Sequence, residues 1–408
     1  MVNSCKKTAF LLLSLIFFTL SALPVAFASD ASDTVKNFSS GGSEIICIAH
    51  RGDWHSFPEN SVEAVNAALD FDAVSVDVRL TSDGKPVLMA DETVDRMCVN
   101  SDGSSVKGAV SSFTLAQLKE FFLRESNGGS DKGKTDCRVA ELKDIYAVAD
   151  GKTAVVLNIS EADFKTVYDY VTALGKNDET VYRINAKSKR IVGLTKDIDN
   201  ITITGNYQGN IIFLATAAVK ECFQNKIYTI ELGSTNGNGV LYDNFLMKRF
   251  VGDKRAMVSM VNGRCGKRSD NETGWDDLIS RGYSVIETDF PDELTDYIKR
   301  TEAAATDLEK YVDLYKDTDL SPYSTDTEKS FISALSSAQA LIGNPSSLSE
   351  LTETCSALRS AHDSLTVGAK KSVALKFSFT PGRIIAVILC AAAFTVGTLY
   401  LRKKRKDK

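Results

Sequence analysis

Short apolar runs alternate with amphipathic stretches between residues 45 and 300, and this alternation constrains the fold more than any other feature of the sequence. Such runs are too short for helices and are typical of strands buried on both faces of a parallel sheet. Between them, Ser61 can cap a helix in which Val62 and Val65 share a face. Repeated strand and helix units over about 250 residues predict a TIM (β/α)8 barrel, although a doubly wound open sheet has the same periodicity. The expected strands are IICIA, AVSVDV, KPVLMA, TAVVLNI, NIIFLA, AMVSM and YSVIETDF.

The pattern changes after Arg300. Residues 301–367 contain no strand-like run, and their apolar residues recur every three or four positions in three segments, which predicts a small helical bundle. The stretch that begins YSTDTEKSFISALSSAQAL resembles the FIVAR-type repeat of bacterial surface proteins. This resemblance implies a spacer or a sugar-binding accessory module, for which a cell-envelope polymer is the expected partner. We expect residues 368–383 to be a linker.

Both ends of the chain are apolar. Residues 1–28 carry Lys6 and Lys7, then an apolar run, then an A-F-A site, which predicts a cleaved secretory signal, with an uncleaved anchor as the alternative. Residues 384–401 carry no charge, and at about 1.5 Å per residue they can just cross a hydrocarbon core. The basic tail at 402–408 is expected on the cytoplasmic side. We therefore expect a single-pass cell-membrane protein with an extracellular N-terminal region; a sorting signal removed with its tail is the alternative.

The net charge and the spacing of the cysteines limit which binding partners and metal sites are expected. The net charge is −5 although both end segments are basic, so the middle of the chain is acidic and no nucleic-acid partner is expected. The cysteines between the end segments match no zinc-site spacing. Cys98 and Cys137 flank a stretch rich in Gly, Ser and Lys, and we expect them to form a disulfide, with free thiols as the alternative.

The residues that could take part in binding or catalysis follow the expected strands. His50, Arg51 and Gly52 come directly after the first strand, and Pro58-Glu59-Asn60 follows shortly afterwards. Catalytic groups of a TIM barrel lie at the carboxyl ends of its strands. Asp77 ends the next expected strand. Further along the chain lie Asp83-Gly84, Val87, Thr288-Asp289 and Pro291.

These motifs, in this order and at this spacing, resemble the glycerophosphodiester phosphodiesterase family across most of residues 45–300. The resemblance implies a TIM barrel that hydrolyses glycerophosphodiesters with a divalent cation, Ca²⁺ or Mg²⁺, and two histidines. One histidine follows the first strand, and the second precedes an aspartate after the D-G turn. The metal is held by an E-x-D motif and by the glutamate of an N-x-E-x-K motif.

The resemblance assigns roles to residues of this chain. His50 matches the first catalytic histidine, and Arg51 a neighbouring catalytic and substrate-binding position. Asp77 matches the second carboxylate of the E-x-D motif and would hold metal. Glu59 matches a neighbouring position that would contact substrate, and with Asp77 and water it could hold metal weakly. Trp54 at the barrel mouth could stack on a ligand or simply pack. Four positions depart from the pattern, because the first carboxylate, the second histidine, the glutamate and the lysine are replaced by Ser75, Ala90, Ser160 and Ala162.

These replacements predict an impaired site. A hard cation prefers several oxygen ligands, and loss of a general acid or base typically costs about 10²–10⁴ in rate. We expect a cell-surface member of this family that binds a phosphodiester or polyol-phosphate ligand but is catalytically impaired. The alternatives are an active phosphodiesterase with a rebuilt site, or a structural surface scaffold. Residues that could rebuild the site, each with an ordinary structural role as the alternative, are His55, Glu287, Asp289 and the run at 264–268.

Overall fold

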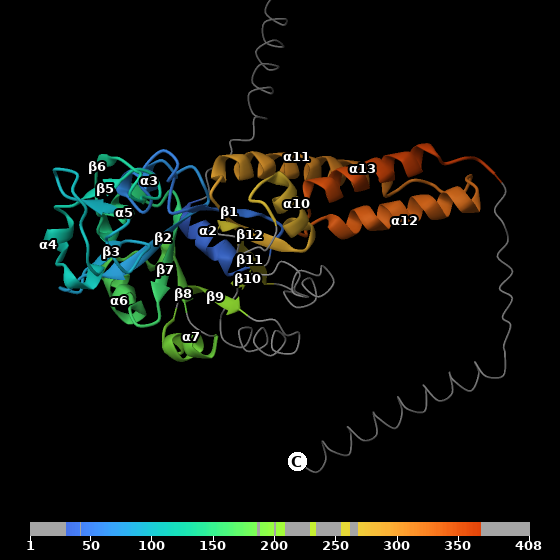
Figure 1. The fold of residues 1–408 in the computed structure, drawn as a ribbon. Coiled ribbons are helices and arrows are strands. Elements are labelled where there is room, and N and C mark those ends of the chain that lie inside the picture. Colours follow the sequence, from blue (N-terminus) through green and yellow to red (C-terminus); the bar gives the residue numbers. More distant parts are fainter. Residues whose placement is uncertain are drawn as a thin grey trace, which may run out of the picture.

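In the computed structural model, eight parallel strands close into a barrel (Figure 1). Strand β1 pairs with β2 on one side and with β12 on the other, which confirms a TIM barrel over an open sheet. The strands, in the order in which they pair around the barrel, are β1 (Ile46–His50), β2 (Ala73–Leu80), β7 (Ala154–Ser160), β8 (Thr180–Asn185), β9 (Thr202–Gln208), β10 (Thr229–Gly233), β11 (Arg255–Ser259) and β12 (Tyr283–Thr288).

The structure describes residues 30–40, 42–185, 188–199, 201–208, 229–233, 254–261 and 268–368. Several predictions fall outside the described residues. These are the secretory signal at 1–28, the strand NIIFLA, most of the run at 264–268, the linker after residue 368, the membrane segment at 384–401 and the basic tail at 402–408. Among the residues that are described, no helix combines the length and the apolar composition needed to cross a membrane.

The prediction that the segment KPVLMA is a parallel strand of the barrel is wrong. The segment KPVLMA forms β3 (Pro86–Leu88), which pairs antiparallel with β2 and is not a barrel strand. The physical reason is the tight turn at Thr81–Lys85, in which the Thr81 backbone N–H donates to the Lys85 carbonyl and Gly84 has a φ of 71°. A turn this short can only join antiparallel strands.

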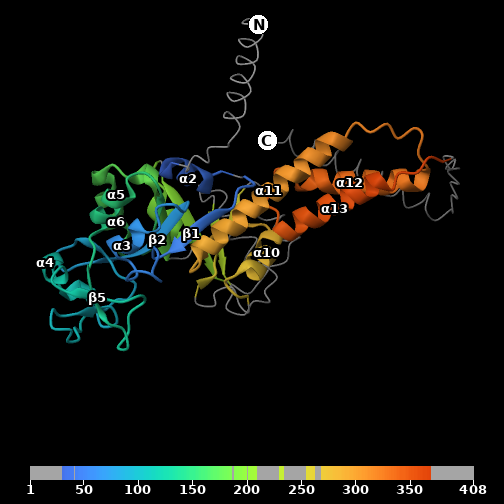
Figure 2. The same ribbon diagram turned by 90° about the horizontal axis from the view of Figure 1, so that it is seen from above.

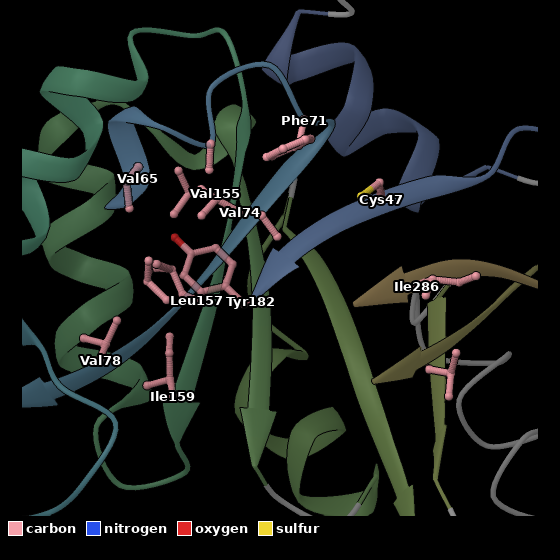
Figure 3. Close-up of a cluster of buried hydrophobic side chains, with 14 of the residues drawn as sticks. Cys47, Val65, Phe71, Val74, Val78, Val155, Leu157, Ile159, Tyr182 and Ile286 are labelled. Atoms are coloured by element: carbon pink, nitrogen blue, oxygen red, sulfur yellow. The ribbon is translucent and has the colours of Figure 1, made fainter. Parts of the chain in front are cut away.

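Helices cover the outer face of the barrel. Ser61 Oγ accepts a hydrogen bond from the Ala64 N–H at 3.1 Å, as expected for the N-cap of the first of them. The outward side chains of the strands, among them Val74, Leu157 and Tyr182, pack between the barrel and the helices in Figure 3. Among the described residues, the covering helices are α3 (Val62–Asn66), α5 (Leu142–Ala149), α6 (Phe164–Leu174), α7 (Ser188–Thr195), α10 (Glu272–Ser280) and α11 (Pro291–Tyr315), with a 3-10 turn at Asn177–Glu179.

The amino end of the barrel is closed by helix α2 (Ala31–Phe38). Val35 and Phe38 join the cluster of inward apolar side chains from the strands, and Phe38 is fully buried. Thr229 donates a 2.5 Å hydrogen bond to the Phe38 carbonyl, and the buried Arg255 guanidinium donates to the carbonyls of Asn37, Ser40 and Glu44. The helix therefore seals this end, and its last carbonyls are satisfied by barrel side chains.

A small subdomain follows β3 and carries a second sheet. Its strands are β4 (Cys98–Val99), β5 (Phe122–Arg124) and β6 (Lys134–Arg138), with a 3-10 turn at Val110–Ser112 and helix α4 (Leu115–Leu118). Cys98 and Cys137 are both free thiols, so the predicted disulfide is wrong. The sheet order is β4-β5-β6, and β5 therefore lies between the two cysteines.

The predicted helical bundle is present. Helix α11 continues without a break through residues 300 and 301 and packs with α12 (Thr325–Leu341) and α13 (Leu348–Asp363) around an apolar cluster of their own. Asp276 of the barrel helix α10 accepts hydrogen bonds from Tyr297 and from the Ser349 backbone N–H at the start of α13. His362 stacks on Tyr315 with the ring centroids 3.9 Å apart. Figures 1 and 2 place this bundle and the β4–β6 subdomain on opposite sides of the barrel.

Candidate active site

The inward side chains change from apolar to polar along the strands. In β2, Ala73 is followed at the carboxyl end by Ser75 and Asp77, because every second residue of a strand faces the same side. The parallel register aligns Asp77 with Asn158 of β7, and Asn158 with Arg183 of β8. The carboxyl end of the barrel is therefore lined by charged and amide side chains.

Arg51 lies across this opening. Its backbone has a φ of 59° and that of Gly52 a φ of 78°, so the chain leaves β1 through a left-handed turn. A Cβ on Gly52 would lie 2.5 Å from the backbone carbon of Ala64, which leaves room only for glycine. Arg51 Nε donates to Asp77 Oδ2 and Arg51 Nη1 to Glu59 Oε2, each at 2.8 Å. The turn therefore places one guanidinium between two of the predicted site carboxylates.

Asp77 is held by donors at both carboxylate oxygens. Asn158 Nδ2 donates to Oδ1 at 2.6 Å, while Asn60 Nδ2 and Arg51 share Oδ2. The Asp77 backbone N–H in turn donates to Asn60 Oδ1 at 2.8 Å. Burial acts to raise the pKa of Asp77, but Arg51, His50 and the two amides outweigh burial and lower this pKa below its ordinary value.

Glu59 is also held at both oxygens. Arg51 donates to Oε2, and Arg96 Nη2 donates to Oε1 at 2.6 Å. Arg96 forms a second pair with Asp91 at 2.7 and 3.1 Å, and it donates to the Asn127 carbonyl. Sequence reasoning did not single out Arg96. Its position five residues after Asp91 was the available signal, but it did not reveal the contact with Glu59.

His50 forms a pair with Asp289 at the barrel mouth. His50 Nδ1 and Asp289 Oδ1 are 2.8 Å apart, and the indole N–H of Trp54 donates to the same oxygen at 2.8 Å. Burial acts to raise the pKa of Asp289, and its hydrogen bond with His50 is the largest of the effects that lower it overall. Because Nδ1 is engaged, Nε2 is the ring nitrogen that can exchange a proton with a ligand. Trp54 thus has a positioning contact with Asp289, and stacking on a ligand stays a prediction.

A buried ion cluster forms the floor beneath these residues. Arg183 Nε donates to Glu231 Oε2 at 2.8 Å, and Arg183 Nη1 contacts both oxygens of Glu287 at 3.1 and 3.0 Å. All three side chains are buried. Burial acts to raise the pKa of Glu287, but Arg183 and then His50 lower it far below its ordinary value. The sequence suggested Glu287 as a possible site carboxylate, whereas Arg183 and Glu231 were missed.

The four departures from the family pattern have other contacts. The Arg51 backbone N–H lies 3.4 Å from Ser75 Oγ, and Ser160 Oγ donates to Asp163 Oδ2 at 2.8 Å. The carbonyl of Ala90 accepts from Arg79 Nη2 at 2.7 Å, and Ala162 is exposed. Glu161, next to the expected glutamate position, pairs with Arg190 at 2.8 Å. None of these four side chains can supply a carboxylate, an imidazole or an ammonium group.

His55 lies in an exposed loop beside the site. Its ring stacks on Trp54 with centroids 4.0 Å apart and on Phe290 at 5.3 Å. Phe57 and Phe290 are 37% and 38% exposed, so the rim of the barrel next to His50 presents aromatic surface to solvent. Of the run at 264–268, the structure describes Arg268, which pairs with Asp277.

The family model described as the glycerophosphoryl diester phosphodiesterase family matches residues 50–256, about half of the chain. The chain belongs to this family. The match begins at His50 and includes β2, β7 and the subdomain after β3. It therefore covers the strands that carry Asp77 and Asn158.

Known family members show similarity over the same region. Glycerophosphodiester phosphodiesterase 1 of Rattus norvegicus is 29% identical over 206 residues, which is 47% of this chain and 58% of that protein. A glycerophosphodiester phosphodiesterase of Caldanaerobacter subterraneus subsp. tengcongensis is 34% identical over 135 residues, 31% of this chain and 53% of that protein. The chain therefore spans a little over half the length of these curated relatives.

A solved structure supports the fold. The glycerophosphoryl diester phosphodiesterase of Parabacteroides distasonis superposes with a TM-score of 0.51 at 19% identity, covering 66% of this chain and 92% of that one. At this identity the similarity shows the barrel fold and does not transfer an activity.

The residues present do not fit the divalent cation that the family generally uses. A Ca²⁺ or Mg²⁺ site needs several oxygen ligands with free lone pairs. Both oxygens of Asp77 and both of Glu59 accept hydrogen bonds from amide or guanidinium groups, and the remaining family positions are Ser75 and Ser160. Within the described ranges, no cluster of three His, Cys, Asp or Glu side chains is arranged to hold a metal.

Proposed function

We propose that this chain is a cell-surface member of the glycerophosphoryl diester phosphodiesterase family that binds a glycerophosphodiester or polyol-phosphate ligand and has lost most of the family's catalytic power. The observation that carries the proposal is that Asp77, the one carboxylate left at the family's metal positions, is held by the Arg51 guanidinium, which also binds Glu59. With Ser75, Ala90, Ser160 and Ala162 at the other family positions, His50 is left without a second proton-transfer group.

Ligand binding is supported by the donors that remain at the mouth. A guanidinium carries more N–H groups than the two that Arg51 uses for Asp77 and Glu59, and their planar arrangement matches phosphate oxygens. His50 Nε2 is a further group that can face a phosphate. The aromatic rim that includes Phe57 and Phe290 offers surface to the rest of the ligand.

The cell-surface location rests on the terminal segments. The apolar run before residue 28 and the uncharged segment at 384–401 with its basic tail support secretion and a single membrane anchor. In this proposal the helical bundle separates the barrel from the membrane and contacts an envelope polymer. Protease added to intact cells should remove the barrel and spare an epitope placed after Arg402.

The test of impairment is hydrolysis of simple glycerophosphodiesters by the 408-residue chain with Ca²⁺ or Mg²⁺. We expect little or no metal-dependent turnover. The combined variant Ser75→Glu, Ala90→His, Ser160→Glu and Ala162→Lys should gain far more activity than the sum of the single changes, because these groups act as a unit. Adding His50→Ala to the combined variant is the matched control and should return the rate to the starting level.

An active enzyme with a rebuilt site is the second candidate. It is favoured by the 2.8 Å contact between His50 and Asp289, because a carboxylate at Nδ1 orients an imidazole for proton transfer. Wild-type turnover that a chelator abolishes and that His50→Ala destroys would establish this candidate and defeat the impaired-site proposal.

Ligand binding is tested separately. Millimolar glycerol phosphate should raise the thermal unfolding midpoint of the wild-type chain, and Arg51→Ala should abolish the shift. The absence of any wild-type shift would leave the pocket without a ligand and would support a structural surface scaffold instead.

A further inference from the structure

Helix α10 joins the barrel to the helical bundle through Asp276. Asp276 Oδ1 accepts hydrogen bonds from the Tyr297 hydroxyl at 2.8 Å and from the Ser349 backbone N–H at 3.1 Å, and Oδ2 accepts one from the Ser349 hydroxyl. The Leu348 backbone N–H donates to the Tyr297 oxygen at 3.0 Å. Leu348 and Ser349 are the first two residues of α13, and N–H groups at this end of a helix have no partner within it. Side chains of α10 and α11 therefore complete the amino end of a bundle helix, and we call these contacts of Asp276 the joint.

The next residue of α10, Asp277, makes different contacts. Its carboxylate pairs with Arg268, which precedes the helix, and with Arg281, which follows it. Asp276 instead faces the amino end of α13, where a helix carries a partial positive charge and a carboxylate is stabilising. Of these two adjacent aspartates, Asp276 therefore holds the bundle, whereas Asp277 holds the segments at the ends of its own helix.

Trp275 connects the joint to Asp270. The Trp275 side chain is buried, and its ring meets that of Tyr297 edge-on with the centroids 6.2 Å apart. Its indole N–H donates to Asp270 Oδ1 at 2.8 Å. Because Trp275 and Asp276 are neighbours on one short helix, a displacement of that helix moves both side chains together. Asp270 and the joint therefore depend on the same element.

Asp270 fixes the turn that carries Asp289. Its Oδ2 accepts a hydrogen bond from the Asp289 backbone N–H, and its Oδ1 accepts one from the Thr288 hydroxyl, each at 2.8 Å. Asp289 Oδ1 in turn lies 2.8 Å from His50 Nδ1 and accepts the hydrogen bond of the Trp54 indole N–H. A continuous series of contacts therefore runs from the first residues of α13 to the histidine at the barrel mouth.

We infer that α10 couples the helical bundle to the barrel mouth, with Asp276 and Asp270 as positioning residues for Asp289 and His50. Figures 1 and 2 show α10 between the barrel strands and the start of α13. A change at the start of α13 moves α10 and, through Asp270, the turn that carries Asp289. A partner that binds the bundle can then alter the mouth, which a bundle that acts only as a spacer cannot do. The inference concerns the protein before any ligand binds, and it stands whether or not glycerol phosphate is the ligand.

The first test uses the two tryptophans of the chain, of which Trp54 lies at the mouth and Trp275 next to the joint. Labelling of the 408-residue chain with 5-fluorotryptophan gives one ¹⁹F resonance for each, and the Trp54 resonance is identified by its loss in Trp54→Phe. Asp276→Ala should shift both resonances. Asp277→Ala is the matched control: it removes the adjacent carboxylate but keeps the joint, and it should leave the Trp54 resonance at its wild-type position. A shift of Trp275 without a shift of Trp54 in Asp276→Ala would overturn the inference.

The second test asks whether the effect passes through Asp270. Asp270→Ala should itself shift the Trp54 resonance, and addition of Asp276→Ala should then cause no further shift, because the connecting carboxylate is already absent. A further shift as large as that of Asp276→Ala alone would contradict the role of Asp270.

Ser349→Ala serves if Asp276→Ala does not fold. It removes one hydrogen bond of the joint from the bundle side and should shift the Trp54 resonance in the same direction by a smaller amount. An unchanged Trp54 resonance in a folded Ser349→Ala protein would then decide against the coupling. None of these readouts depends on turnover or on glycerol phosphate, so they can fail independently of the proposed function.

Discussion

The two halves of the barrel interior are built by the same strands but are filled with different chemistry. At the amino end, Ile48, Val156 and Met257 pack with Phe38 of α2 in a cluster without charges. At the carboxyl end, the next inward positions carry Asp77 and Arg183 together with their partners. We call the half at the amino ends of the strands the lower half and the half at their carboxyl ends the upper half. The stability of the lower half comes mainly from burial of apolar area, whereas that of the upper half depends on the balance of buried charges. A single change of charge should therefore be most costly in the upper half, although the lower half also holds one buried cation, Arg255, whose partners are backbone carbonyls.

Arg183→Met should produce the largest effect. It leaves Glu231 and Glu287 as uncompensated buried carboxylates, and loss of one partner of a buried ion pair costs about 3–5 kcal/mol. The free energy of unfolding from urea titration is the measurement. The matched control is Arg190→Met, whose side chain is 71% exposed and pairs with Glu161, and which should change stability by about 0–1 kcal/mol. Equal effects of the two substitutions would break the comparison between the halves.

Phe38→Ala tests the lower half. Phe38 is fully buried between α2 and the strands, and removal of a buried aromatic ring should cost about 3 kcal/mol through lost burial and an unfilled cavity. Phe57→Ala is the control, because Phe57 is 37% exposed. We expect Phe38→Ala to leave the pH dependence of unfolding unchanged, since no charged group is altered. A changed pH dependence would show that the two halves are coupled.

Acid should lower the free energy of unfolding through the buried carboxylates of the upper half. The folded-state pKa values of Asp77, Asp289 and Glu287 all lie below their ordinary values, so the stability that they contribute is present above about pH 4.5 and is lost progressively as the pH falls below it. Asp72 and Asp270 have raised pKa values, mainly through burial, and act in the opposite direction. The check is a comparison of unfolding between pH 3 and 7 for wild type and Glu287→Gln, in which the variant should lose less stability in acid.

Trp54→Phe should have the smallest effect. It removes one of the two hydrogen bonds to Asp289 Oδ1 and keeps the ring that stacks on His55, which should cost about 1 kcal/mol. Weaker glycerol phosphate binding should accompany this loss if His50 contacts the ligand. Phe290→Leu is the control, because Phe290 also stacks on His55 but does not hydrogen-bond to Asp289 through its side chain. Loss of binding in the control alone would mean that the aromatic rim holds the ligand and His50 does not.

The sequence predicted the strongly apolar strands of the barrel better than those with polar inward residues. Strands β1, β2, β7, β11 and β12 were expected because they contain long apolar runs. Strands β8, β9 and β10 were not among the expected segments, because polar inward residues such as Arg183, Thr204 and Glu231 interrupt the apolar pattern. Those interruptions mark the floor of the candidate site. Periodicity is therefore weakest where the barrel carries its buried charges.

By itself, the sequence predicted alternating strands and helices, the helical bundle, and His50, Arg51, Glu59 and Asp77 as candidate site residues, because periodicity and motif spacing are local properties of the chain. Closure of the strands into a barrel was decided by the structure. Only the tertiary structure decided the partners of these residues. His50 meets Asp289 across 239 positions, and Arg183 meets Glu231 across 48 and Glu287 across 104. Closure of the barrel sets these distances, just as β5 separates Cys98 from Cys137. Which carboxylate receives which cation depends on strand register and on the Arg51 turn, and neither can be derived from spacing alone.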